Sequence, residues 1–166
     1  MEFTNRISQK LHEEHRATVA LVERLEQLIA RHRQGAPDVK DRATAQLLGD
    51  LSVGIASEVE RHFAFEENHL FSYLAAIGDS AIGAHLTDEH GAIRPLGTRI
   101  ASLARAAATQ GFDAAGWETF RRTSQEFCER MLTHVQKEEM ALLPLINETM
   151  DADTEARLYV EYVENA

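Results

Sequence analysis

Four long segments of this chain repeat their apolar residues with the period of an α-helix, and three short breaks separate them. The segments run over about residues 5–32, 41–76, 81–108 and 114–150. Each break contains glycine and the first also contains proline, residues that end helices. Loops this short make consecutive helices antiparallel. The pattern predicts an all-α, up-down-up-down four-helix bundle, followed by a short C-terminal helix over about residues 154–163.

The composition agrees with this fold and argues against several classes of function. The 166 residues are about the size of one domain, which we expect to span residues 1–166. A net charge of −10 without a basic cluster argues against nucleic acid as a partner. No apolar run approaches the roughly 20 residues that cross a bilayer, and the first residues lack the apolar core of a signal peptide. The single cysteine, Cys128, excludes an internal disulfide and a thiolate metal cage. We therefore expect a cytoplasmic protein without a membrane partner.

Each predicted helix carries a histidine in its apolar seam, at a position where an apolar residue would belong. These histidines are His15, His62, His90 and His134. Counting residues from the loops at 1.5 Å per helical residue places them within roughly 3–6 Å of one level of the core. A single histidine in a seam is usually a hydrogen-bonded core residue. Four histidines at one level indicate a common site.

The second and fourth segments also share a motif. Residues 62–70 and 134–142 both read His-x-x-x-Glu-Glu-x-x-Leu, and Glu14-His15 corresponds to Glu89-His90. The chain therefore looks like two copies of one helical hairpin, related by pseudo-two-fold symmetry. A histidine and a glutamate four residues apart lie on one face of a helix. The predicted site comprises His15, His62, Glu66, His90, His134 and Glu138.

Two metal ions explain why carboxylates and imidazoles would be buried together. Without a cation, each buried carboxylate would cost several kcal/mol or become protonated. Imidazole and carboxylate ligands suit iron, manganese or zinc, and inward-facing glutamate and histidine hold di-iron centres in helix bundles. We expect two iron ions, with zinc or manganese as alternatives. Glu67 and Glu139 follow the inner glutamates and are expected on the flanks, where they can orient histidines.

Other polar residues near the seams are expected to have lesser roles. His12 lies three residues before His15 and is expected on the solvated face rather than as an extra ligand. His69 lies one turn beyond the inner glutamate of its helix, and we expect it to face inward and hydrogen-bond to the site. Glu58 and Arg130 occupy matching positions in the two repeats and are expected to form an ion pair.

The ordered set of motifs resembles the hemerythrin-like family, also called the HHE cation-binding domain. The carrying residues are Glu14-His15, 62–71, Glu89-His90 and 134–145, and the resemblance covers about residues 9–147. It implies a four-helix bundle with a non-haem di-iron centre, bridged by the two glutamates and often by an oxo or hydroxo group. It also implies a role with O₂, peroxide or nitric oxide, or in iron sensing.

Two departures distinguish this chain from the oxygen-carrying members that it resembles. Those members have a further histidine four residues before the histidine of the third helix, where this chain has Leu86. They also have an aspartate five residues after the histidine of the fourth helix, whereas this chain has Glu138 at four. Fewer protein ligands leave positions open for a small ligand or substrate.

Three functions are therefore left open, and none of them names a protein partner. The first is a di-iron protein that binds or senses O₂, peroxide or nitric oxide. The second is a di-iron enzyme that decomposes peroxide. The third is a non-catalytic, metal-stabilised interaction or iron-storage module.

Overall fold

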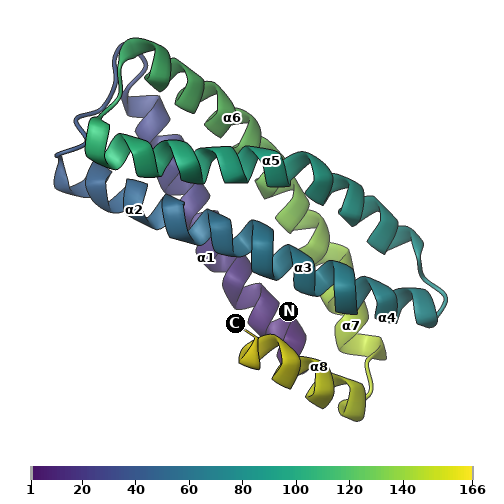
Figure 1. The fold of residues 1–166 in the computed structure, drawn as a ribbon. Helices are drawn as coiled ribbons and strands as arrows, with labels where there is room; N and C mark the ends of the chain where they lie inside the picture. The colour runs from purple at the N-terminus through teal and green to yellow at the C-terminus, as the bar shows by residue number, and fades with distance from the viewer. Residues whose placement is uncertain (1, 166) are drawn as a thin grey trace.

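The computed structural model describes residues 2–165, which form helices and contain no strand (Figure 1). The first two long rods are α1 (Arg6–Arg31) and the rod composed of α2 (Arg42–Ser57), η1 (Glu58–His62), α3 (Phe63–Phe65), η2 (Glu66–Leu70) and α4 (Phe71–Ala76), in which the η elements are π-helical turns. The other two are α5 (Ala81–Gln110) and the rod composed of α6 (Ala114–Lys137), η3 (Glu138–Leu142) and α7 (Leu143–Thr149). A short helix, α8 (Ala152–Glu164), follows. The predicted all-α bundle with a short C-terminal helix is confirmed.

Polar side chains and a glycine set the ends of several helices. Four side chains accept a hydrogen bond from a backbone N–H in the first turn of the helix that follows: Asn5, Asp41, Asp113 and Asp151. Gly111 ends α5 with a φ of 73°, a backbone conformation that glycine adopts without steric cost. Of these residues, Gly111 and Asp113 lie in the break predicted between residues 108 and 114.

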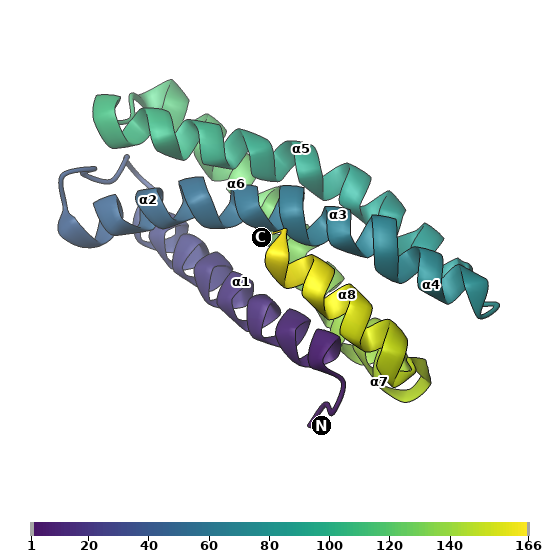
Figure 2. The same ribbon diagram turned by 60° about the horizontal axis from the view of Figure 1, so that its bottom comes forward.

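The four rods pack in a ring, with sequence neighbours antiparallel. Both α1 and α5 contact α2 and α6, so the two rods that carry the repeated motif lie diagonally across the bundle. In Figure 2, α8 starts near α7 and runs back along the bundle, with its C-terminal end beside α3, and it also contacts α1. Within residues 2–165, no helix combines the length and apolar character that crossing a membrane requires.

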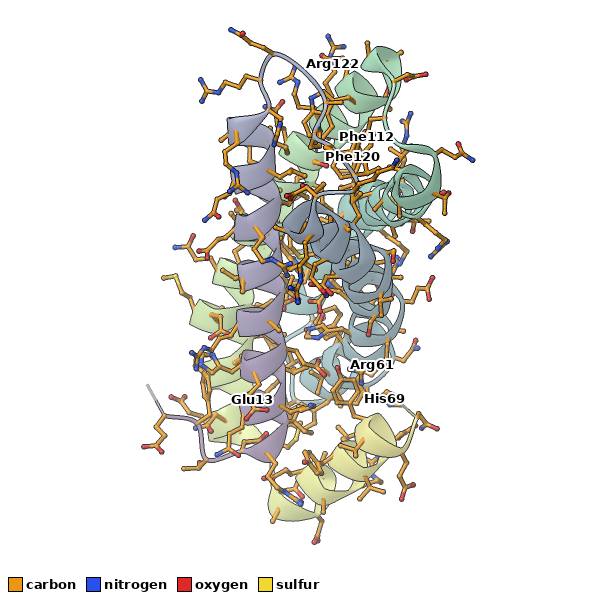
Figure 3. The ribbon with its side chains drawn as sticks, turned by 90° about the vertical axis from the view of Figure 1, so that its left-hand side faces the viewer. Glu13, Arg61, His69, Phe112, Phe120 and Arg122 are labelled. Carbon is orange, nitrogen blue, oxygen red and sulfur yellow. The ribbon has the colours of Figure 1, made fainter. Side chains whose placement is uncertain are left out.

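The core has two apolar clusters, one on either side of the six predicted site residues. The first lies toward the α1–α2 and α5–α6 loops and includes Leu25, Leu48 and Phe120. The second lies toward α8 and includes Leu11 and Leu74. Figure 3 shows Phe112 and Phe120 at the end of the bundle away from α8, and Arg61 and His69 beside α8. The predicted site is thus enclosed by apolar packing along the bundle axis.

Two of the π-helical turns begin at the inner glutamates of the two repeats. Glu66 starts η2 and Glu138 starts η3. A π-helical turn closes hydrogen bonds between residues i and i+5, so each residue rotates the chain less than in an α-helix. The directions of two successive glutamate side chains therefore differ by a smaller angle than in an α-helix. In each rod the first glutamate points into the core and the second points to a neighbouring rod. Such turns occur frequently at functional sites.

Gly97 marks a close approach of α5 to the second rod. A Cβ atom at this position would lie 2.8 Å from Val59 Cγ1 and 3.0 Å from Ile55 Cγ2. We expect Gly97→Ala to lower the free energy of unfolding by about 1–3 kcal/mol, because the crowded neighbours must move. The measurement is the urea midpoint at constant m-value.

The matched control is Gly49→Ala in α2, where a Cβ atom would have no neighbour within 4 Å among the described residues. Alanine there should raise the free energy of unfolding by about 0.5–1 kcal/mol, because it lowers the chain entropy lost on folding. Equal effects at the two positions would contradict the close approach at Gly97.

Candidate metal centre

The structure brings all six predicted site residues together at one level of the core. Each is at most 1 % exposed. They come from α1, α5 and α6, and from the three π-helical turns that carry His62, Glu66 and Glu138. The ring centroids of His15 and His62 lie 5.1 Å apart, and those of His90 and His134 lie 4.7 Å apart. The histidines thus form two pairs.

Glu66 lies between the two histidine pairs and presents one carboxylate oxygen to each. Its Oε1 is 3.0 Å from His62 Nε2, and its Oε2 is 3.2 Å from His90 Nε2. A carboxylate placed in this way is able to bridge two ions, each bound on one side by a different histidine pair.

Glu138 repeats this arrangement from the diagonal rod. Its Oε2 is 2.8 Å from His15 Nε2, and its Oε1 is 2.7 Å from His134 Nε2. The two glutamates therefore face each other across the pseudo-two-fold axis that the repeated motif predicted, and both span the two histidine pairs.

Two overlapping groups of potential ligands result. One contains His15 and His62 and the other contains His90 and His134, and both contain Glu66 and Glu138. Within each group the ligand atoms lie within 4.8 Å of one another. Two imidazoles and two shared carboxylates per ion make a set suited to iron, manganese or zinc.

The unsatisfied polar atoms at this site test whether the residues fit metal ions. Several buried atoms make no hydrogen bond within the described part of the chain: His15 Nε2, Glu66 Oε2, Glu138 Oε1 and Glu138 Oε2. All four atoms belong to the two groups of potential ligands. Buried polar atoms without partners are costly, and cations between them would remove that cost. The donor set fits two ions.

Every histidine of the site is held from outside by a second glutamate, through Nδ1. The pairs are His15–Glu139 at 2.6 Å, His62–Glu14 at 2.9 Å, His90–Glu67 at 2.9 Å and His134–Glu89 at 3.0 Å. A carboxylate at Nδ1 holds the proton there and directs the Nε2 lone pair inward, which is the arrangement a metal-binding histidine requires.

The orienting role predicted for Glu67 and Glu139 is confirmed. Each acts on a histidine of the other repeat, since Glu67 holds His90 and Glu139 holds His15. Sequence reasoning missed the equivalent role of Glu14 and Glu89. The sequence did carry a signal for this role, because Glu14 and Glu89 occupy the same position in the repeated Glu-His pair.

The four outer glutamates are anchored differently, although the repeats are symmetric. Glu67 accepts a hydrogen bond from Arg94 at 2.9 Å, and Glu139 pairs with His12 at 2.8 Å. His12 is thus a half-exposed partner of an outer glutamate, and the structure does not place it among the ligand groups. Glu89 accepts a hydrogen bond from Lys137, and Glu14 accepts from Arg61 and Tyr162.

The electrostatics of the site favour protonated histidines when no metal is bound. Burial alone would lower the pKa of His15, but its contacts with the carboxylates of Glu138 and Glu139 outweigh the burial and raise the pKa to about 9. The pKa of His90 is also raised to about 9, because contacts with Glu138 and Glu66 outweigh its burial. Metal ions and protons therefore compete for these nitrogens well above the ordinary pKa of histidine.

The predicted ion pair between Glu58 and Arg130 is wrong. Glu58 is 7 % exposed and accepts a hydrogen bond from Thr18, whereas Arg130 is exposed and donates to Glu126 on its own helix. The π-helical turn η1 begins at Glu58 and has no counterpart around Arg130, which lies in regular α6. The lower rotation per residue in η1 turns Glu58 inward, so the two positions lose their equivalence.

The predicted inward orientation of His69 is also wrong. Its Nε2 lies 3.3 Å from Glu161 Oε1 of α8, and its side chain is 29 % exposed. His69 lies within η2, where the smaller rotation per residue turns it away from Glu66 and toward the side of the bundle.

Aromatic and aliphatic side chains close the site. The ring of Phe63 stacks on His90, with centroids 3.8 Å apart and planes 7° from parallel. Leu11 and Leu86 lie one turn before His15 and His90 and are 0 % and 3 % exposed. Apolar side chains therefore cover the six residues along the bundle axis, while the outer glutamates lie at their flanks.

One family of known proteins matches this chain. The model of the hemerythrin HHE cation-binding domain matches residues 6–146, which include all six site residues. Comparison with individual curated proteins gives no match. The family match, the helical bundle and the paired His–Glu groups agree, and the chain belongs to the hemerythrin HHE cation-binding domain family.

Proposed function

We propose that this protein holds two iron ions and uses them to bind or sense O₂, peroxide or nitric oxide. The observation that carries the proposal is the position of Glu66 and Glu138, each with one oxygen beside each histidine pair. One ion would be held by His15 and His62 and the other by His90 and His134, with both glutamates shared.

Iron in such a site supplies redox chemistry and open positions for small ligands when it is bound. The chain itself supplies the rest of the site. The outer glutamates hold the Nδ1 protons, so the histidines stay in the metal-binding tautomer. With two imidazoles and two shared carboxylates, each ion has fewer protein ligands than a six-coordinate iron accepts.

The apolar surroundings support a small, weakly polar ligand. Phe63, Leu11 and Leu86 are buried next to the histidines and offer no hydrogen bond to a polar substrate. A diatomic molecule or peroxide fits such surroundings better than a large or charged metabolite. The same side chains keep bulk water away from the site.

The test is anaerobic loading of the metal-free protein with Fe²⁺, followed by metal analysis and exposure to O₂. We expect about two irons per chain and near-ultraviolet bands of an oxo-bridged di-iron centre. Steady release of oxygen from hydrogen peroxide, faster than with free iron, would instead favour the peroxide-decomposing enzyme. Failure to bind iron under conditions where zinc binds would overturn the proposal.

Replacing Leu86 by histidine tests the open position. Leu86 is 3 % exposed and lies one helical turn before His90, so a histidine there would offer an imidazole to the ion held by His90 and His134. We expect the affinity of that ion for azide to fall about tenfold, equivalent to about 1.4 kcal/mol, because the new ligand occupies the open position.

The control is Leu86→Met, which keeps an apolar side chain of similar volume and adds no imidazole. Iron content, azide affinity and peroxide turnover are measured on both variants and on the unmodified protein. If Leu86→His matches Leu86→Met in all three, position 86 does not face the ion.

A further inference from the structure

The last helix of the chain reaches the candidate metal centre through one side chain. Tyr162 of α8 is 3 % exposed, and its hydroxyl donates a hydrogen bond to Glu14 Oε2. The same oxygen accepts a hydrogen bond from His62 Nδ1 at 2.9 Å. Residues from three separate parts of the chain thus meet at one carboxylate. Helix α8 lies beyond residues 6–146, which the family match covers.

Tyr162 is held in a defined position on the bundle. Its ring stacks on Phe65 with centroids 4.1 Å apart, and the guanidinium of Arg61 lies 4.6 Å above it. Arg61 also donates to Glu14 Oε1 at 2.7 Å. Both oxygens of Glu14 are therefore fixed, one by the second rod and the other by α8. Figure 3 shows Arg61 on the side of the bundle that faces α8.

Other contacts fasten α8 to the bundle without reaching the centre. Arg6 pairs with Glu155 at 2.8 Å and lies 4.7 Å over the ring of Tyr159. Leu158 is 2 % exposed within the second apolar cluster. These contacts account for the docking of α8, so the hydrogen bond from Tyr162 to Glu14 is an additional link and not a requirement for packing.

Among the described residues, no side chain of α8 hydrogen-bonds to the glutamates that hold the other histidine pair. Glu89 is the repeat counterpart of Glu14 and holds His134 Nδ1 at 3.0 Å. It accepts its second hydrogen bond from Lys137, whose side chain is 42 % exposed on α6. Glu14 is thus supported by a buried tyrosine from a separate helix, whereas Glu89 is supported by a half-exposed lysine on the same rod as His134.

We propose that Tyr162 is a positioning residue, which acts through Glu14 on His62 and makes the ion held by His15 and His62 depend on the docking of α8. The inference rests on the two-ion centre proposed above. Residues that orient a metal ligand through hydrogen bonds change the affinity of the site for the metal. A coupling between two sites acts equally in both directions. Docked α8 therefore strengthens binding of this ion, and the bound ion strengthens docking of α8.

The first test compares full-length, metal-free protein with the variants Tyr162→Phe and Tyr159→Phe in anaerobic calorimetric titrations with Fe²⁺. Tyr162→Phe keeps the ring stacked on Phe65 and removes only the hydroxyl. We expect it to lower the affinity for one of the two ions about tenfold and to leave the affinity for the other unchanged. Tenfold is the lower end of the range found when a partner of a metal ligand is altered. Tyr159→Phe removes a hydroxyl from the same helix and should change neither ion.

The route through Glu14 is tested by combining variants. In a Glu14→Gln background, Tyr162→Phe should have no further effect on the weaker ion, because the residue through which it acts has already been altered. In a Glu89→Gln background, the effect of Tyr162→Phe should remain tenfold. Equal effects of Tyr162→Phe on iron affinity in the two backgrounds would show that Tyr162 does not act through Glu14.

The reverse coupling is measured by hydrogen exchange of the α8 amides, residues 152–164. Fe²⁺ should slow their exchange in the unmodified protein and have a much smaller effect in Tyr162→Phe. A purely structural role would change exchange in the metal-free protein but would leave its response to iron intact.

The outcomes separate this inference from the proposed function. If the unmodified protein binds two irons and Tyr162→Phe gives the same titration curve, the coupling is refuted and the di-iron function stands. If the unmodified protein does not bind two ions, both fail. A uniform weakening of the two ions in Tyr162→Phe also overturns the inference, since it indicates general destabilisation.

Discussion

Alanine at Glu66 or Glu138 is expected to lower the affinity for both metal ions by more than about 100-fold. This is more than the usual effect of altering a residue that only hydrogen-bonds to a ligand. The reason is that each carboxylate has one oxygen next to each histidine pair. Glu66 lies 3.0 Å from His62 and 3.2 Å from His90, so a single substitution removes a ligand from both ions. The measurement is iron content after anaerobic loading and gel filtration.

The matched controls are Glu67→Ala and Glu139→Ala, one residue further along in each motif. Each of these carboxylates touches one histidine, at Nδ1 and from outside. We expect each of these two variants to lower the affinity for one ion by about 10–100-fold and to leave the affinity for the other nearly unchanged. If all four variants retain equal iron, the inner and outer roles have been assigned incorrectly.

Much of this centre could be predicted from the sequence, because its information is periodic and duplicated. The helical period gave the four rods, and the breaks fixed their antiparallel order. The repeat His-x-x-x-Glu-Glu then placed Glu66 and Glu138 on inward faces, where the structure has them 0 % and 1 % exposed. Whether these residues bind iron stays a prediction.

The wrong predictions for Glu58 and His69 arise from π-helical turns, which change the direction in which the side chains point. The turns η1, η2 and η3 shift hydrogen bonds from the α to the π pattern, and no residue type in them demands it. The shift at η1 explains why Glu58 turns inward while its repeat counterpart Arg130 stays exposed. Tyr162 had no signal at all, because it lies outside the repeat and reaches Glu14 through the packing of α8.

Metal removal is expected to make the stability of the protein fall between about pH 6.5 and about pH 9. In the metal-free protein the pKa of His15 and that of His90 are about 9, since contacts with the glutamates outweigh burial. A folded-state pKa above the unfolded value of about 6.5 stabilises the folded form fully below that pH, and the stabilisation is lost as the pH rises toward 9. Each unit of pKa difference corresponds to about 1.4 kcal/mol, so the expected loss is several kcal/mol.

Glu138 does not cancel this effect. Contacts with His134 and His15 outweigh burial and hold its pKa well below the ordinary value. A lowered carboxyl pKa stabilises the folded form above the unfolded value and is lost only as the pH falls through the folded one. Its contribution is therefore constant above about pH 5.

In the iron-loaded protein this loss is not expected, because a metal-bound histidine must be neutral at every pH. Protons compete with iron for His15 and His90 up to about pH 9, so apparent affinity and metal stabilisation both increase with pH. At a free metal concentration about 1,000 times Kd, each ion adds about 4 kcal/mol. We expect urea unfolding under anaerobic conditions to show the metal-free form losing stability from about pH 6.5 to about pH 8.5. The loaded form should gain stability only up to about pH 7 and stay nearly constant above it, because its histidines are then neutral in both the folded and the unfolded state. His15→Gln should flatten part of the metal-free slope, and a metal-free protein that instead becomes more stable over this range would contradict the charge balance described for the site.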